Sequence, residues 1–562
     1  MNRKRDAKFV FASVGKRHPM RFALVTLPLG MLLSLAAFAQ EVPSQKVDQI
    51  FSVYDKPGSP GCSLGVIRNG EFVYRKAYGL ASLELGVPLS SQSVFYMASV
   101  SKQFTATAAV LAAEQGFLSL DDDVRKYIPE LPDYGHVITL RQMIHQTSGF
   151  RDFFELLTLS GHDRSDFNSP EEIFRIVVRQ KGLNNVPGEE WIYSNTNYFL
   201  LGMVVKRTTK KSLSEFAAEN VLKPLGMSHT LFYDDHTLVV AGRVPAYDSG
   251  PHDSFRVDWS TTDALVGSGG LMSTVDDLLL WDRNFYANRL GKGTLIQQLQ
   301  TPGVLNNGNK ISYAMGLRLG SYRGLPIVEH GGVTFGYRTE LLRFPEQKFT
   351  VICLCNIASA EPKNLARQVA DLYLADKLRP GASALNPPSN GGFRDPAEFA
   401  GKYLDPRTHL MFTFTASNGD LIWDGEVLMR INANQFYDLE SEVITFEASE
   451  GVMHIKVETE GETYFSGSRI QEVNLGDPLL ASYTGQFRST ELDAVYGLSL
   501  EKDTLTLRNR DNPPQKLTLI AKDEFDAGNL GTLVFGRDSG GRVVGLRVFT
   551  DRARGIAFQK TN

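Results

Sequence analysis

The hydrophobic pattern of the first two-thirds of the chain mixes strand-like and helix-like segments. Residues 349–355 are almost continuously apolar, which is typical of a strand buried on both faces, and residues 337–344 predict a second strand. Residues 103–115 are rich in Ala, contain no Pro and end at Gly116, which predicts a helix with a glycine after its C-terminus. Residues 364–377 predict another helix. The pattern therefore predicts a domain that contains both strands and helices.

The chain beyond residue 378 follows a different pattern. Residues 379–394 are rich in Pro, Gly, Ser and Asn and predict a linker. Short runs of alternating apolar and polar residues follow, separated by turn signals such as Asn418-Gly419, which is typical of all-β sandwiches and barrels. Residues 399–403 (Phe-Ala-Gly-Lys-Tyr) resemble residues 483–487 (Tyr-Thr-Gly-Gln-Phe). This weak repeat predicts two β modules, over residues 395–475 and 480–562.

The start of the chain has the features of an export signal. A basic segment is followed by an apolar run and by the triplet Ala-Phe-Ala at residues 37–39, which predicts a signal peptide over residues 1–39. The apolar run is short for a membrane span. We expect an exported protein, periplasmic or secreted, with no stable membrane span after cleavage. The sequence leaves open whether the signal is cleaved and whether translation starts at Met1 or Met20.

Composition narrows the function classes. Hydrophobic residues make up 42% and charged residues 22% of the chain, as in ordinary globular proteins. Residues 1–39 hold seven of the 59 Lys and Arg residues and one of the 63 Asp and Glu residues, so residues 40–562 carry a net charge of −10. This acidic balance argues against nucleic acid as a partner.

The cysteines and histidines give no sign of a metal or cofactor site. Three cysteines make no even disulfide framework, and Cys62, Cys353 and Cys355 lie in strand-like apolar runs, so we expect all three to be small buried hydrophobic residues. The ten histidines show no ligand spacing such as His-x-x-x-His, so we expect no metal and no cofactor.

Two serines are candidate nucleophiles. Ser99 precedes the predicted helix 103–115, and Lys102 lies one turn further along on the same face, where its amine can take the serine proton. Ser63 lies in a Gly-x-Ser-x-Gly pattern, but that motif needs a strand, a sharp turn and a helix. Here Asn69-Gly70 predicts a type I′ turn into a second strand, so Ser63 is predicted to be a strand residue in a hairpin.

Two further motifs support the interpretation of Ser99 and Lys102 as a nucleophile and its base. They are Tyr193-Ser194-Asn195, and His330-Gly331-Gly332 before the predicted strand 337–344. In this order and spacing the motifs resemble those of the penicillin-recognising serine hydrolases, which include class C β-lactamases, DD-peptidases, D-aminopeptidases and related esterases. The resemblance covers residues 45–378 and implies an α/β (α+β), β-lactamase/transpeptidase-like domain with an antiparallel sheet flanked by helices. With two lipocalin-like barrels behind it, the architecture is similar to that of bacterial D-aminopeptidases.

The resemblance also implies roles for the matching residues. Ser99 would attack an acyl carbonyl, Lys102 would assist removal of its proton, and Tyr193 would pass a proton to the leaving group. Asn195 would either hydrogen-bond the acyl side chain or hold Lys102. The oxyanion hole would be formed by the backbone N–H groups of Ser99 and Val333.

The third motif departs from that of classical β-lactamases, which carry Lys where this chain has His330. Gly332 lets the strand approach the substrate closely. A mostly neutral imidazole holds a carboxylate less well than an ammonium group does. We therefore expect an acyl-enzyme hydrolase of small amide, peptide or ester substrates that contain a D-amino acid.

The same machinery leaves other functions open. A class C-like β-lactamase, a DD-peptidase and an acylated sensor that does not turn over would use the same residues. The exact substrate, the role of the β modules and the oligomeric state are open as well. A β-module loop that reaches the cleft would restrict substrate size, as the resemblance to D-aminopeptidases implies.

Overall fold

The computed structural model describes residues 43–162, 169–252, 254–258, 265–379, 394–423, 425–438, 442–459, 462–471 and 477–561. The predicted signal peptide and residues 380–393 of the predicted linker lie outside the described residues. The chain divides into two units, and every feature below belongs to the unit Val42–Asn562. None of the helices within the described residues combines the length and hydropathy needed to cross a membrane.

A six-stranded antiparallel sheet forms the centre of the N-terminal domain, in the order β10-β11-β12-β13-β1-β2. Its strands are β1 (Cys62–Arg68), β2 (Glu71–Tyr78), β10 (Arg318–Tyr322), β11 (Leu325–Thr334), β12 (Tyr337–Phe344) and β13 (Phe349–Cys355). The two predicted strands, 337–344 and 349–355, are therefore confirmed as β12 and β13. The first and last segments of the domain meet in this sheet, because β1 pairs with β13.

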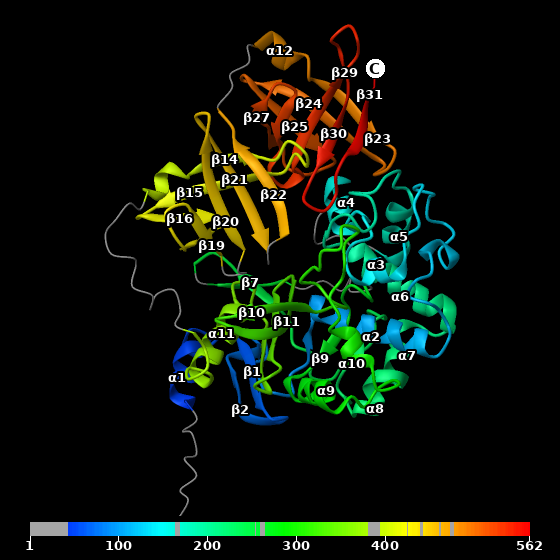
Figure 1. Ribbon diagram of the computed structural model, residues 1–562, viewed down its shortest axis with the longest axis vertical. Coiled ribbons are helices and arrows are strands. Elements are labelled where there is room, and N and C mark those ends of the chain that lie inside the picture. The colour runs from blue at the N-terminus through cyan, green and yellow to red at the C-terminus, as the bar shows by residue number, and fades with distance from the viewer. Residues whose placement is uncertain are drawn as a thin grey trace, which may run out of the picture. The chain divides into compact units, whose positions relative to one another are not determined.

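Helices cover both faces of the sheet, which explains why β13 is apolar throughout. Side chains alternate along a strand, so Ile352 and Leu354 belong to one hydrophobic cluster while Val351 and Cys353 belong to another. Helices α1 (Ser44–Phe51) and α11 (Pro362–Tyr373) cover the second of these faces, and Figure 1 shows them side by side. The predicted α/β (α+β) domain is confirmed.

The other face carries the remaining helices of the domain. They are α2 (Ser101–Glu114), α3 (Leu140–Ile144), α4 (Phe153–Leu159), α5 (Pro170–Val178), α6 (Asn195–Thr209), α7 (Leu213–Ala217), α8 (Lys223–Leu225), α9 (Val275–Ala287) and α10 (Leu295–Leu299). Short strands lie between them: β3 (Leu80–Ser82), β4 (Val87–Pro88), β5 (Phe95–Tyr96), β6 (Leu231–Phe232), β7 (Tyr247–Ser249), β8 (Phe255–Val257) and β9 (Leu271–Ser273).

The β1–β2 hairpin removes Ser63 as a candidate nucleophile, as predicted. Asn69 and Gly70 have φ values of 54° and 78°, the left-handed conformation that a type I′ turn requires. Ser63 is fully buried in β1, and its hydroxyl donates to the carbonyl oxygen of Ser90.

All three cysteines are buried, as expected, but the interpretation of all three as simple hydrophobic residues was wrong. Cys62 and Cys355 form a disulfide, and only Cys353 is a free thiol among the described cysteines. The two half-cystines lie directly opposite each other in the antiparallel β1–β13 pair. Because the two residues are 293 positions apart along the chain, no local sequence pattern could predict that they meet.

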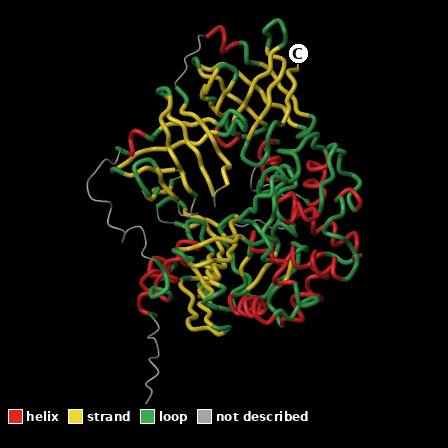
Figure 2. The backbone as a smooth tube through the Cα atoms, in the orientation of Figure 1, coloured by secondary structure: helices red, strands yellow, loops and turns green. Residues whose placement is uncertain are grey.

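The C-terminal region forms two all-β modules with the same strand order. Figure 2 shows both as strands and loops with few helical turns. The first contains β14 (Gly401–Leu404), β15 (Met411–Ser417), β16 (Asp420–Trp423), β17 (Glu426–Val427), β18 (Met429–Arg430), β19 (Gln435–Tyr437), β20 (Val443–Ser449), β21 (Val452–Thr459) and β22 (Glu462–Arg469). Helix α12 (Asp477–Ala481) separates it from the second.

The second module repeats this arrangement. Its strands are β23 (Gly485–Ser489), β24 (Ala494–Glu501), β25 (Thr504–Asn509), β26 (Gln515–Lys516), β27 (Thr518–Ala521), β28 (Glu524–Asp526), β29 (Thr532–Arg537), β30 (Val543–Phe549) and β31 (Ile556–Thr561). In each module the strand that begins within the repeated sequence pairs with the last strand, β14 with β22 and β23 with β31. The all-β character is confirmed, whereas likeness to lipocalins stays a prediction.

Candidate active site

Ser99 lies in a short 3-10 turn, Ala98–Val100, which leads directly into α2. Ala98 has a φ of 47°, in the left-handed region that disfavours a residue with a side chain. Such backbone strain costs ~1–3 kcal/mol and is concentrated at functional sites. The predicted helix and its terminal Gly116, with a φ of 83°, are confirmed.

Lys102 is fully buried and faces Ser99. Its Nζ lies 3.0 Å from Ser99 Oγ, 2.8 Å from Asn195 Oδ1 and 2.8 Å from the Ser268 carbonyl oxygen. The amide and carbonyl oxygens can only accept, so a neutral amine donates its two hydrogens to them and keeps its lone pair for the Ser99 hydroxyl. Burial lowers the pKa of Lys102 well below its usual value and favours this neutral form. The arrangement suits a general base.

Asn195 holds Lys102, one of the two roles that the sequence left open. It begins α6, and its side-chain amide donates to Asp152 Oδ2 at 2.9 Å. Asp152 is itself fully buried and caps α4, accepting from the backbone N–H groups of Phe154 and Glu155. Its negative charge raises the pKa of Lys102 and so opposes the effect of burial. Sequence reasoning missed Asp152, although its place before the apolar run 153–159 marks a helix N-cap.

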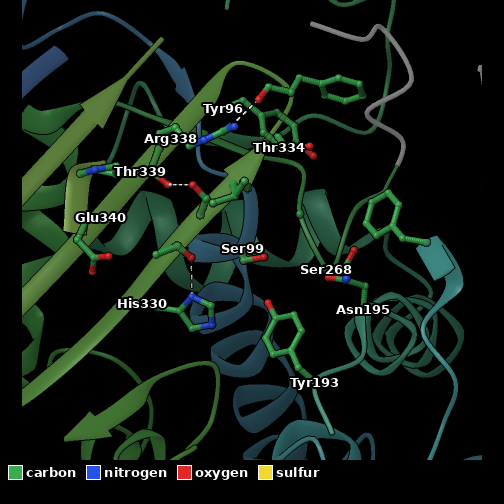
Figure 3. A pocket seen from close by; sticks show the side chains of 18 of the residues that line it. Tyr96, Ser99, Tyr193, Asn195, Ser268, His330, Thr334, Arg338, Thr339 and Glu340 are labelled. Carbon is green, nitrogen blue, oxygen red and sulfur yellow. Dashed lines mark hydrogen bonds between the residues drawn. The ribbon is translucent and has the colours of Figure 1, made fainter. Parts of the chain in front are cut away.

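Tyr193 approaches Ser99 from the opposite side of the cavity to β11, as Figure 3 shows. Its hydroxyl points toward Ser99, whose interaction with the phenol lowers the pKa of Tyr193, and its ring centroid lies 4.8 Å from Lys102 Nζ. Burial raises the pKa of Tyr193 to about 12, so the phenol keeps its proton at neutral pH. A lysine with a lowered pKa and a tyrosine with a raised pKa beside one serine suit a base and an acid respectively.

The third motif places β11 against the turn that carries Ser99. β10 pairs with β11 only over Leu325–Glu329, so residues 330–334 continue along the cavity beyond it. A Cβ on Gly332 would stand 2.4 Å from the carbonyl oxygen of Met97, so only glycine permits this approach. Val333 follows at the cavity, with a side chain that is 65% exposed.

His330 is buried, and its contacts fit a neutral ring. Its Nδ1 lies 2.7 Å from the Gly331 carbonyl oxygen, which can only accept, so Nδ1 carries a proton. Its Nε2 lies 3.2 Å from the Tyr313 hydroxyl, which can donate to it. This assignment rests on the hydrogen-bond partners. An uncharged imidazole at this position stays a prediction.

Cationic side chains reach the cavity from outside the three motifs, namely those of Arg318, Arg338, Lys363 and Arg552. The cavity has a volume of about 840 Å³ and is lined by residues that include Arg318 from β10 and Arg552 from the loop between β30 and β31. The guanidinium centre of Arg318 lies 5.6 Å from the Trp191 ring centroid, and that of Arg552 lies 5.3 Å from the Tyr193 ring centroid. Sequence reasoning missed both because no local spacing links them to Ser99.

The described residues contain a single group of three side chains close enough to share a metal ion: Cys62, Cys353 and Cys355. Two of these sulfurs form the disulfide and the third is a fully buried thiol whose pKa is raised by burial. A bonded disulfide is not a thiolate donor, so this group does not suit a metal.

The fold and the arrangement around Ser99 define a serine hydrolase. The family model described as beta-lactamase matches residues 47–375. The chain belongs to the beta-lactamase family.

Similar proteins extend the likeness to the C-terminal modules. A D-aminopeptidase of Brucella canis is 24% identical over 531 residues, which cover 89% of this chain and 96% of the relative. A D-aminopeptidase of Gluconobacter oxydans is 26% identical over 537 residues, which cover 90% and 96%.

Two solved structures share the fold. The octameric penicillin-binding protein homologue from Pyrococcus abyssi aligns with a TM-score of 0.54 and 19% identity over 83% of this chain and 98% of that chain. The D-amino acid amidase from Ochrobactrum anthropi SV3 aligns with a TM-score of 0.51 and 22% identity over 59% and 99%.

Proposed function

We propose that this chain is an exported hydrolase that forms an acyl-enzyme on Ser99 and cleaves small amide, peptide or ester substrates that contain a D-amino acid. The observation that carries the chemistry is the arrangement of Lys102 and Tyr193 on Ser99. Lys102 Nζ lies 3.0 Å from Ser99 Oγ, and the Tyr193 hydroxyl points toward the same serine.

The proton transfers follow from this arrangement. Ser99 gives its proton to Lys102 as its oxygen bonds to the acyl carbon. The carbonyl oxygen gains negative charge, which the backbone N–H groups of Ser99 and Val333 would stabilise. Tyr193 donates its phenolic proton to the departing nitrogen or oxygen as that bond breaks, and the Lys102 proton then returns to Tyr193. Water releases the acyl group by the reverse sequence.

The substrate class rests on the relatives and on His330. The D-aminopeptidases align over both the hydrolase domain and the β modules. The neutral His330 ring suits neutral or amine-bearing acyl groups better than a carboxylate. Export is supported by the Cys62–Cys355 disulfide, because disulfides persist in oxidising compartments outside the cytosol.

The test is a panel of assays on the purified protein and its Ser99→Ala variant. We expect hydrolysis of D-amino-acid amides and D-peptides to exceed hydrolysis of the L enantiomers and of a chromogenic cephalosporin. A preference for L substrates would overturn the D-substrate part of the proposal. A protein that stays covalently labelled by its substrate would be an acylated sensor instead.

A second candidate, a DD-peptidase or class C-like β-lactamase, is favoured by one observation. Arg318 and Arg552 supply, within the same cavity, permanent positive charge of the kind that His330 lacks. A preference of the native protein for cephalosporins or D-alanyl-D-alanine would support this candidate. His330→Lys should shift the activity ratio toward cephalosporins if His330 sets the preference, because it adds a charge able to hold a carboxylate.

A further inference from the structure

The β30–β31 loop of the second β module is fixed against the hydrolase site. The Arg552 carbonyl oxygen accepts from the backbone N–H of Asp152 and from the side-chain amide of Asn184, both at 2.9 Å. The Arg554 carbonyl oxygen accepts from Arg151 Nη2 at 2.8 Å, and the Arg554 N–H donates to Asn184 Oδ1. These contacts hold the backbone of the loop on the same segment that supplies Asp152.

The anchored backbone directs the Arg552 side chain into the cavity. Its guanidinium centre lies 5.3 Å from the Tyr193 ring centroid, within the range of a cation–π contact. Its Nε lies 3.2 Å from Asp551 Oδ2, in a pair that is 41% and 58% exposed. The Tyr193 ring therefore lies close to both the Lys102 amine and the Arg552 guanidinium.

The charge of Arg552 acts on both partners of Ser99. It lowers the pKa of Lys102, because two positive charges repel, and it lowers the pKa of Tyr193, because it attracts the phenolate. Several other charged or titratable groups face the same site and set the background: Asp152 from the α4 N-cap, Glu155 from α4, Asp551 from the loop, Arg318 from β10, His330 from β11, Tyr198 from α6 and Tyr313 from the segment before β10.

We propose that Arg552, carried by the second β module, is a positioning residue of the hydrolase site whose fixed charge stabilises the Tyr193 phenolate formed during proton transfer. When the phenolic proton moves to the departing nitrogen, the C–N bond breaks and the negative charge stays on the Tyr193 oxygen until the Lys102 proton returns. A guanidinium is charged at every working pH, so it holds this anion without a proton transfer of its own. This inference rests on the proposed acyl transfer at Ser99, but not on its D-amino-acid substrates.

The test compares pH–rate profiles of the full chain with those of Arg552→Gln and Arg552→Lys. The readouts are hydrolysis of p-nitroacetanilide, whose departing nitrogen must be protonated, and the rate of Ser99 labelling by a fluorophosphonate, whose fluoride leaving group needs no proton. In Arg552→Gln the pKa values of Lys102 and Tyr193 both rise. The limb that requires neutral Lys102 therefore moves to higher pH. Hydrolysis of p-nitroacetanilide falls ~10-fold, because the phenolate formed on Tyr193 has lost its fixed cation, and labelling falls less. Arg552→Lys keeps a positive charge and should recover most of the profile.

A matched control tests whether the loss of any arginine from this module changes the pH–rate profile. Arg542→Gln removes an arginine from the same module at a site that is 85% exposed and paired with Asp538, and we expect it to leave the profile unchanged. Thermal unfolding checks that each variant folds. No loss of p-nitroacetanilide hydrolysis in Arg552→Gln, or equal losses of this hydrolysis and of fluorophosphonate labelling, overturns the inference, as does Arg552→Lys behaving like Arg552→Gln.

The outcomes also distinguish this inference from the proposed function. If the native chain is labelled at Ser99 and its profile shifts in Arg552→Gln, but no D substrate is hydrolysed, only the substrate class of the proposed function fails. If the fluorophosphonate labels no serine at any pH, the acyl-transfer site fails and the role of Arg552 fails with it.

Discussion

The two β modules share a strand order but are joined to the hydrolase domain in different ways. Core residues of the second module, among them Tyr496 and Phe558, belong to the same hydrophobic cluster as those of the hydrolase domain, whereas Phe399 and Phe446 of the first module form a cluster of their own. The Tyr496 hydroxyl donates to the carbonyl oxygen of Leu159 at the end of α4. The second module is thus packed as part of the hydrolase domain.

The ion pairs that join each module to the hydrolase domain show the same difference. The second module supplies Glu491 to a buried ion pair with Arg151, whose side chains are 6% and 5% exposed. The first module supplies Arg407 to an ion pair with Glu190, whose side chains are 58% and 29% exposed. Buried pairs resist disruption far more than exposed ones. A duplicated module can therefore contribute to a catalytic site in one copy and remain peripheral in the other.

The strongest test of this comparison asks whether all the chemistry lies in the hydrolase domain. We expect Ser99→Ala to abolish acyl transfer and labelling by a fluorophosphonate or penicillin-type probe, because Ser99 carries the hydroxyl that Lys102 Nζ contacts. Ser63→Ala should leave both intact, since Ser63 is buried in β1. Mass spectrometry of the labelled peptide gives the answer. Labelling of a serine in either module would break the comparison.

A second test addresses the proton donor that Arg552 contacts. We expect Tyr193→Phe to lower turnover by about 10²–10⁴-fold with a smaller effect on substrate binding, because the phenol moves a proton and its ring is retained. Steady-state kinetics separate kcat from KM. Near-normal turnover in Tyr193→Phe would show that another group donates the proton and would remove the reason for Arg552 to lie there.

The sequence was sufficient for parts of the site whose residues are close along the chain. Ser99 and Lys102 were found because helical spacing places them together, and the hairpin that excludes Ser63 was found from Asn69-Gly70. Motif resemblance joined Tyr193 and His330 to them. These features depend on local conformation, which sequence pattern reports directly.

The parts that were missed depend on long-range packing. Arg552 reaches Tyr193 only because the second module packs on α4, and Cys62 meets Cys355 only because the first and last strands of the sheet are neighbours. Neither pairing has a periodic signal, since each is decided by which surfaces are buried together. Asp152 is intermediate: its role as a helix cap was readable, but its contact with Asn195 was not.

A third test weakens the attachment of the second module. We expect Glu491→Ala to lower the free energy of unfolding by about 3–5 kcal/mol, because it leaves the Arg151 guanidinium buried without its partner. Activity should fall as well, since Arg151 also donates to the Arg554 carbonyl oxygen in the loop that carries Arg552. Chemical denaturation measures the first effect and ester hydrolysis the second. A loss below about 1 kcal/mol would mean that the ion pair is solvated and the module loosely held.

The smallest effect should come from the matching change in the first module. Arg407→Ala removes an exposed pair with Glu190, so we expect a change of about 0–1 kcal/mol in the free energy of unfolding. Glu190 keeps Arg554 as a partner at 2.9 Å, which leaves its charge compensated. Ester hydrolysis should stay within about twofold of the native rate, because Arg407 does not line the cavity. If Arg407→Ala instead matched Glu491→Ala in both measurements, the two modules would be equally integral to the hydrolase and the distinction drawn from their cores would be lost.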